Sequence, residues 1–405
     1  MSEAVFSPQP PRPRSLARIA WFGLPIILAV LALILARYDA PYLEHILKKK
    51  DFTNYWVASK LILDGRGLEL FRGQEVYFAA LREYAGSDIN WHNWSYPPHY
   101  LFVILPWGLL GYLPAAALFL SVTLALFLYA VSTAGGGWKL SVLLLLLPAI
   151  ICNIGFMQNG FLTSALLIYG LSLRQTRPLI AGIAIGMMTI KPQLGFLLPI
   201  LLVFERRWTV IFSAASTAVL MIGLTLFVWG REAWTGYLTI NLPYQKDVLL
   251  YLYGLFTYMM PSTYGSLRVI SVEPGPAMQL HCLVAILALI AYIYCLIRTN
   301  SNQARAAATV FATFMISPYS LIYDLGSLTA IAALTVAAAI DAGVTGKSGG
   351  LFRLFPLLFV CILPLLTVTF AIADFPISPL VIAAAWLCAM AVAVPQKIDV
   401  PFAAG

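Results

Sequence analysis

The chain consists of long apolar runs interrupted by one extended polar stretch near its start. Runs long enough to cross a bilayer, which takes about 20 residues, are predicted at 19–36, 208–229, 277–297, 325–342, 354–372 and 377–394, with a shorter one at 305–317. Of the 405 residues, 61% are hydrophobic and 10% are charged, whereas a soluble domain carries about 25% charge. The pattern therefore predicts an all-α polytopic membrane protein.

The region 99–205 is harder to divide, because prolines, glycines and polar residues leave only short apolar segments. Two paths both give about twelve transmembrane helices in total. In the first, 99–132 crosses once and the chain turns outside at Asn159 and again at Lys191. In the second, 99–132 is a hairpin and 179–204 is one kinked helix. We favour the first, because it keeps more positive residues inside, as membrane proteins prefer: Lys139, Arg174, Arg177, Arg206 and Arg207.

Basic residues ahead of the first apolar run place the N-terminus in the cytoplasm. This gives a cytoplasmic tail at 1–18, a single transmembrane domain at 19–395 and a second tail at 396–405, with extracytoplasmic segments at 37–98 and 230–276. The same rule explains the formal charge of +8 without a nucleic-acid partner. The five cysteines all lie in apolar runs, so neither a disulfide framework nor a metal site is expected.

The first outer loop, 37–98, is the main polar segment. It holds eight basic and eight acidic residues and is therefore neutral. Apolar residues at helical spacing predict helices from Asp51 to about Leu63 and from Gln74 to Tyr84. We expect both to be short amphipathic helices lying on the membrane surface. Connections between spans are usually short, so a loop of this length indicates binding or chemistry.

Asp51 stands directly after three lysines, where the first loop helix is predicted to begin. It is either an N-cap, whose carboxylate accepts from the amides near Thr53 and Asn54, or a catalytic carboxylate, and the two roles are compatible. At the other end of the loop, Trp91 and Trp94 are typical of an aromatic belt at the membrane surface.

Further polar features lie within or beside the apolar runs. Lys191 precedes a proline, so a broken helix would expose it to a cavity or a partner, with a lysine snorkelling to the surface as the alternative. Gln158 and Asn159 form either a plain polar turn or a binding site. Asp324 puts a carboxylate at an outer membrane edge, with a solvated loop aspartate as the alternative. The second outer segment carries cations that could meet a phosphate or a sugar, none singled out by spacing: Arg231, Lys246 and Arg268.

Taken in order, these motifs resemble glycosyltransferase family 87, which includes the mycobacterial polyprenol-phosphate-mannose-dependent α-1,2-mannosyltransferases. The motifs are Asp51-Phe-x-x-Tyr55, Tyr96-Pro97-Pro98, Gln158-Asn159, Lys191-Pro192, and Ser317-Pro318-Tyr319 followed by Tyr323-Asp324. The resemblance covers roughly 45–395. The tyrosines of the Ser-Pro motif stand where the mycobacterial members tend to have histidines, which leaves the sugar and the acceptor open.

The resemblance implies the GT-C fold, a polyprenyl-phosphate sugar as donor, an active site on the outer face of the cell membrane and Asp51 as catalytic base. It also implies a contact between Lys191 and the donor phosphate. The first loop has no Asp-x-Asp pair, so no metal or other cofactor is expected. We expect the donor and a glycolipid or glycan acceptor to be bound, among membrane lipids, by Tyr55, Tyr96, Gln158, Asn159, Lys191, Gln193, Arg268, Tyr319, Tyr323 and Asp324.

The leading hypothesis is therefore an inverting hexosyltransferase, with mannose as the first sugar to test. A transporter or flippase is one alternative, but such proteins often carry internal repeats, and the large first loop has no counterpart in the second half. A polymerase or ligase of lipid-linked oligosaccharides is another alternative, and it would act on diphosphate-linked glycans.

Overall fold

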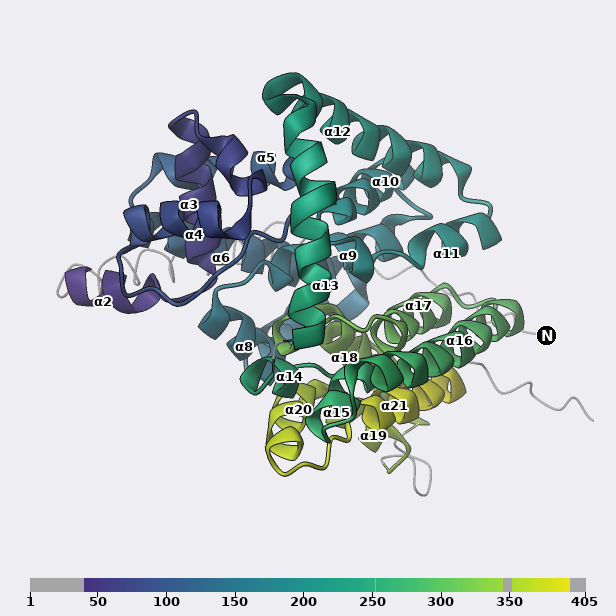
Figure 1. Ribbon diagram of the computed structural model, residues 1–405. Helices are drawn as coiled ribbons and strands as arrows, with labels where there is room; N and C mark the ends of the chain where they lie inside the picture. The colour runs from purple at the N-terminus through teal and green to yellow at the C-terminus, as the bar shows by residue number, and fades with distance from the viewer. Residues whose placement is uncertain (1–39, 252, 345–351, 394–405) are drawn as a thin grey trace, which may run out of the picture.

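A computed structural model describes residues 40–251, 253–344 and 352–393 (Figure 1). The predicted first span at 19–36 and both predicted tails lie outside these residues. Within them every regular element is a helix, as predicted: α2 (Ala40–Leu47), α3 (Phe52–Leu63), α4 (Gln74–Ala85), α5 (Leu101–Ile104), α6 (Tyr112–Val131), α7 (Gly137–Leu144), α8 (Pro148–Phe156), α9 (Gly160–Leu173), α10 (Pro178–Met187), α11 (Leu198–Phe204), α12 (Trp208–Gly236), α13 (Leu242–Tyr251), α14 (Leu255–Tyr258), α15 (Thr263–Val269), α16 (Pro274–Arg298), α17 (Asn302–Ile316), α18 (Gly326–Asp341), α19 (Phe355–Cys361), α20 (Leu363–Ile372) and α21 (Ser378–Ala393).

The described helices are those of a membrane-embedded protein. Three continuous helical stretches are long and apolar enough to cross a bilayer, Tyr112–Leu144, Trp208–Tyr251 and Pro274–Arg298, and a bent pair made of α19 and α20 gives up to four. The remaining apolar helices are shorter. A polytopic membrane protein is therefore confirmed, whereas the count of twelve spans stays a prediction.

Two predicted spans differ from the helices that form. The run at 354–372 is not one helix, because α19 and α20 are bent by 77° at a break. Pro364 explains the bend, since it has no amide hydrogen to continue the helical ladder. The run at 208–229 continues past a kink at Gly230, whose φ of 70° is a conformation that glycine adopts without strain.

The path of the chain through 99–205 follows the first of the two predicted routes. α6 crosses the bundle once, and α10 leads to a turn at Lys191 from which α11 returns. Arg174, which follows α9, forms a bidentate ion pair of 2.8 and 2.9 Å with Glu205, which follows α11. The second route is wrong, because it would place Arg174 and Glu205 on opposite sides of the membrane.

The same ion pair belongs to a basic cluster that we call the arginine clamp: Arg174, Glu205, Arg207 and Arg305. Both side chains of the central pair are at least 97% buried, and Arg207 and Arg305 approach the Glu205 carboxylate at 3.6 and 3.7 Å. The clamp lies where α12 begins and α16 meets α17, at the end of the bundle away from the first loop (Figure 1). It ties four helices together at that end.

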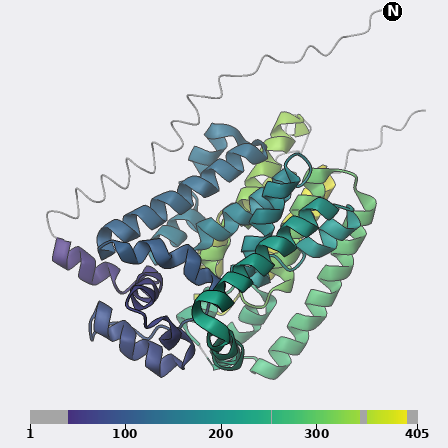
Figure 2. The same cartoon turned by 90° about the horizontal axis from the view of Figure 1, so that it is seen from above.

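The first-loop helices and α13 lie at the other end, where α13 is seen end-on in Figure 2 while α16 runs along the side. The prediction that both loop helices lie on the membrane surface is wrong for α3. Phe52, Tyr55 and Leu61 are at most 1% exposed, because the helix packs under the segment that re-enters after Pro98. Trp94 is likewise buried rather than in a surface belt, while Trp91 is 44% exposed.

α10 and α12 pack closely through small residues. A Cβ atom on Gly182 would lie 2.3 Å from the Cβ of Ser213, and one on Gly186 would lie 2.6 Å from the carbonyl oxygen of Ala214. The four-residue spacing of the two glycines puts both on one face of α10 and lets the helix backbones approach, a common device in membranes.

We expect Gly186→Ala to destabilise the protein by about 1–3 kcal/mol, because the added methyl group has no space between α10 and α12. Gly223→Ala is the matched control on α12. A Cβ there meets nothing within 4 Å, and alanine favours a helix by up to about 1 kcal/mol. Thermal unfolding of the purified protein in detergent measures both, and equal midpoints for the two variants would contradict the packing argument.

Candidate active site

A cavity of about 970 Å³ opens at the end of the bundle that carries the first loop. Its walls come from the start of α3, the loop segment 90–97, the turns at 156–158 and 190–193, α13, and the segment 317–323. α13 passes in front of these segments, across the direction of α12 and α16 (Figure 1). The cavity is therefore assembled from stretches that are far apart in the sequence.

Asp51 lies in the wall of this cavity, with 26% of its side chain exposed. Its backbone amide donates to the Phe156 carbonyl oxygen at 3.2 Å. The N-cap interpretation is wrong, because the carboxylate makes no capping hydrogen bond. The amides it would cap are already satisfied, since the backbone carbonyls of Lys50 and Asp51 accept from Thr53 and Asn54. The carboxylate is thus left to face the cavity.

Gln158 fixes the orientation of that carboxylate. α8 ends at Met157 in a left-handed conformation (φ 56°), which turns the following side chain toward Asp51. The Gln158 Oε1 accepts from the Tyr55 hydroxyl at 2.5 Å and from the Tyr96 hydroxyl at 3.4 Å. The amide nitrogen Nε2 is therefore directed at Asp51 Oδ2, 2.8 Å away. Hydrogen bonds from buried Tyr55 and half-buried Tyr96 thus orient Gln158, which binds one carboxylate oxygen and leaves Oδ1 facing His92 and the cavity.

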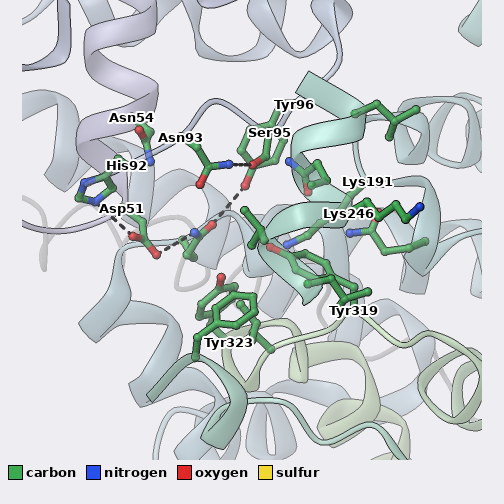
Figure 3. Close-up of a pocket in the computed structure, with 18 of the residues that line it drawn as sticks. Asp51, Asn54, His92, Asn93, Ser95, Tyr96, Lys191, Lys246, Tyr319 and Tyr323 are labelled. Atoms are coloured by element: carbon green, nitrogen blue, oxygen red, sulfur yellow. Dashed lines mark hydrogen bonds and ion pairs between the residues drawn. The ribbon is translucent and has the colours of Figure 1, made fainter. Parts of the chain in front are cut away.

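His92 faces that other oxygen, with Nε2 3.6 Å from Asp51 Oδ1 (Figure 3). Its Nδ1 lies 2.8 Å from the Asn90 carbonyl oxygen and must donate to it. Burial lowers the pKa of His92, but the adjacent Asp51 carboxylate and the Asn90 carbonyl outweigh it and raise the pKa above its ordinary value of 6.5. Sequence reasoning missed His92 because the surrounding tryptophans indicated a membrane-surface segment.

This pair predicts a pH-dependent contribution to stability. Because the pKa of folded His92 lies above its unfolded value, the contribution is complete below about pH 6.5 and is lost as the pH rises through the folded pKa. We expect His92→Gln to lower the free energy of unfolding by up to about 1 kcal/mol at low pH and by less at high pH.

Thermal unfolding at about pH 6 and about pH 8 tests this, with His45→Gln as the control. His45 pairs with Asp88 on the surface, where both side chains are more than 50% exposed, so solvent screens that pair. A His92→Gln effect of the same size at both pH values would show that His92 does not act through its charge.

Lys191, in the cavity wall, and Asp324, directly behind it, form a buried ion pair. Lys191 Nζ lies 2.5 Å from Asp324 Oδ1, and the two side chains are 8% and 1% exposed. Asp324 Oδ2 accepts from the Leu321 amide at 3.2 Å, and Asn159 Oδ1 lies 3.5 Å from the lysine nitrogen. The alternatives of a snorkelling lysine and a solvated loop aspartate are therefore wrong. Each residue is the partner of the other.

The structure brings most of the predicted site residues together. Those that line the cavity are Asp51, Tyr96, Gln158, Lys191, Gln193, Tyr319 and Tyr323. Tyr55, Asn159 and Asp324 lie directly behind them and hold them in place. Arg268 is the exception, because it is not among the lining residues. It is buried on α15, donates to the Val272 carbonyl oxygen at 2.6 Å and stacks on Tyr253.

Several lining residues were not predicted. Asn93, Ser95 and Gln245 add amide and hydroxyl groups, and an apolar part of the wall comes from α13, Phe256 and Met259. Among the residues that the structure describes, no group of three or more His, Cys, Asp or Glu side chains lies close enough to hold a metal ion.

The fold and the cavity define a membrane-embedded protein with a carboxylate-bearing, hydroxyl-rich cavity at one end of its helical bundle. The family model of glycosyltransferase family 87 matches residues 94–318, more than half of the 405 residues. The chain belongs to glycosyltransferase family 87, as its motifs indicated, and is a glycosyltransferase. No curated protein and no solved structure matches it. The matched region contains Gln158 and Lys191 but not Asp51.

Proposed function

We propose that the protein is an inverting hexosyltransferase that moves a sugar, mannose first among the candidates, from a polyprenyl-phosphate donor to a glycolipid or glycan acceptor. The observation that carries the proposal is the Asp51 carboxylate, fixed by Gln158 at a cavity that also has an apolar wall. Such a cavity suits a substrate with a polar sugar at one end and a lipid at the other.

In this mechanism Asp51 acts as the general base. Its Oδ1 oxygen, which faces the cavity beside His92 and is not bonded to Gln158, accepts the proton of an acceptor hydroxyl while that hydroxyl oxygen bonds to the anomeric carbon. The bond between the anomeric carbon and the phosphate oxygen breaks on the opposite face, and polyprenyl phosphate leaves with the electron pair. Tyr319 and Tyr323 also line the cavity and offer ring faces and hydroxyls to a sugar.

We further propose a GT-C fold of about twelve spans in the cell membrane, with the cavity open to the outside. The arginine clamp supports this orientation. Positive residues concentrate on the cytoplasmic side, and the clamp gathers three arginines at the end of the bundle away from the first loop. The cavity at the opposite end would then face the outer surface, where lipid-linked sugars meet their acceptors.

The test is a transfer assay with the purified full chain in lipid nanodiscs. The substrates are polyprenyl-phosphate-mannose and extracted membrane glycolipids, and mass spectrometry measures the release of polyprenyl phosphate. We expect release that depends on added acceptor. If mannose is not transferred, polyprenyl-phosphate glucose and galactose follow. Failure with every monophosphate donor, together with turnover of a diphosphate-linked glycan, would overturn the proposal in favour of a polymerase or ligase.

A further inference from the structure

Four lysines line the cavity, and the structure separates them by their partners: Lys49, Lys50, Lys191 and Lys246. Lys49 pairs with Asp88 at 2.8 Å, and Lys191 pairs with Asp324 at 2.5 Å. Lys50 and Lys246 have no anionic partner within the described ranges. A phosphate bound at Lys191 would have to compete with a buried carboxylate that is already in contact. The uncompensated positive charge of the cavity therefore resides on Lys50 and Lys246.

Position distinguishes these two lysines. Lys50 is the chain neighbour of Asp51, whereas Lys246 lies across the cavity from Asp51, on the side of Tyr319 (Figure 3). An inverting transfer requires the leaving group to depart from the face opposite the attacking oxygen. A phosphate that leaves away from the base therefore leaves toward Lys246.

The surroundings of Lys246 indicate what the phosphate is attached to. Leu238, Leu242, Lys246 and Leu249 all line the cavity and follow one another at intervals of four, four and three residues, so the ammonium group interrupts an apolar stripe. Leu238 and Leu242 are 55% and 47% exposed and so have apolar surface left to cover. A free phosphate gains nothing from that stripe, whereas a phosphate ester of a long hydrocarbon chain can cover it.

The stripe is held in place over the cavity. Asn241 Nδ2 donates to the carbonyl oxygens of Leu70 and Trp94 at 3.0 and 2.9 Å, just before α13. At the other end of the helix, the Tyr264 hydroxyl donates to the Leu249 carbonyl oxygen at 2.9 Å. Both ends of α13 are thus anchored to neighbouring elements, which fixes Lys246 relative to Asp51 before a ligand arrives.

We infer that Lys246, within the apolar stripe of α13, binds the phosphate of the lipid-linked donor, and that Lys191 serves to hold the cavity wall through Asp324. The inference rests on the proposed function and assigns the donor subsite within it. The ligand class is a phosphate monoester of a polyprenol, with the phosphate on Lys246 and the first isoprene units along the leucines.

The test measures binding of undecaprenyl phosphate and of the neutral undecaprenol to the full chain in detergent, by quenching of tryptophan fluorescence. We expect Lys246→Gln to weaken binding of undecaprenyl phosphate about 10–100-fold, the worth of one charged hydrogen bond, and to leave undecaprenol binding unchanged. Lys246→Arg should retain most of the affinity. Lys139 is exposed on α7 and does not line the cavity. Lys139→Gln is therefore the control, and it should bind both lipids as the wild type does.

The remaining outcomes separate the two proposals. If the wild type binds undecaprenyl phosphate and Lys246→Gln binds it equally well, the assignment of Lys246 is overturned while the proposed function stands. If inorganic phosphate displaces the lipid at matched concentration, the leucine stripe has no role and the lipid part of the assignment fails. If the wild type binds no undecaprenyl phosphate at all, the proposed function itself fails.

Discussion

Replacing Asp51 with asparagine should lower the rate of sugar transfer by about 10²–10⁴-fold, the usual contribution of a general base. Asparagine has the shape of aspartate, and its side-chain oxygen can still accept from Gln158 Nε2, now 2.8 Å from Asp51. The cavity therefore keeps its geometry while the proton acceptor is lost. Because Asp51 is the proposed base and not part of the proposed lipid site, we expect kcat to fall while the KM for the donor stays close to the wild-type value.

Asp64→Asn is the matched control for this experiment. Asp64 belongs to the same loop and is exposed, and it does not line the cavity. Its replacement should leave the transfer rate unchanged. If Asp51→Asn transferred sugar at the wild-type rate, the acceptor proton would have to go elsewhere, and the assignment of the base would be abandoned.

Breaking the buried pair should have the largest effect on stability. We expect Lys191→Met to lower the free energy of unfolding by about 3–5 kcal/mol, because the Asp324 carboxylate, 1% exposed, is left without its counter-charge. The double replacement Lys191→Met with Asp324→Asn should recover most of this loss, since no net charge then remains buried. Thermal unfolding in detergent measures all three proteins.

Lys49→Met provides the comparison, because Lys49 and Asp88 also form a close ion pair, at 2.8 Å, but with side chains 39% and 52% exposed. An exposed pair is worth about 0–1 kcal/mol, so this variant should unfold close to the wild type. A Lys191→Met midpoint equal to that of Lys49→Met would mean that the buried pair is hydrated and does not stabilise the cavity wall.

Much of the fold follows from local pattern, which is why its helices could be predicted. Apolar runs placed α16 and α21 to within three residues, and helical spacing placed α4. The breaks at Pro364 and Gly230 are local interruptions of apolar runs, whereas the placement of α3 failed for a non-local reason. Whether α3 lies on a membrane or inside the protein depends on what covers it, and the segment that covers it returns only after Pro98.

The candidate site, like the fold, could be predicted from local pattern only in part. Motifs were sufficient to select Asp51, Gln158 and Lys191, but the partners of these residues come from distant parts of the chain. Asp324 stands 133 positions after Lys191, and no periodicity connects the two. His92 could not be distinguished from its tryptophan neighbours because its importance depends on the position of Asp51. The sequence did not distinguish Lys246 from Arg231 and Arg268. In the structure, Lys49 and Lys191 of the cavity each pair with a carboxylate, whereas Lys246 does not.

The lengths of the helices that lead to the two cavity turns bear on the depth of the cavity in the membrane. α9 has 14 residues, and the 10 residues of α10 are followed by the short helical turn Met188–Ile190 before Lys191. Each path therefore rises about 21 Å, whereas the hydrocarbon layer is about 30 Å thick. Both helices start or end beside the arginine clamp. In the proposed orientation, with the clamp on the cytoplasmic side, the turns that carry Gln158 and Lys191 would lie below the outer headgroups, and the cavity floor would lie within the hydrocarbon layer. If the donor phosphate binds there as proposed, the acceptor would have to enter the cavity to reach it, which favours slender, flexible acceptor ends over bulky ones.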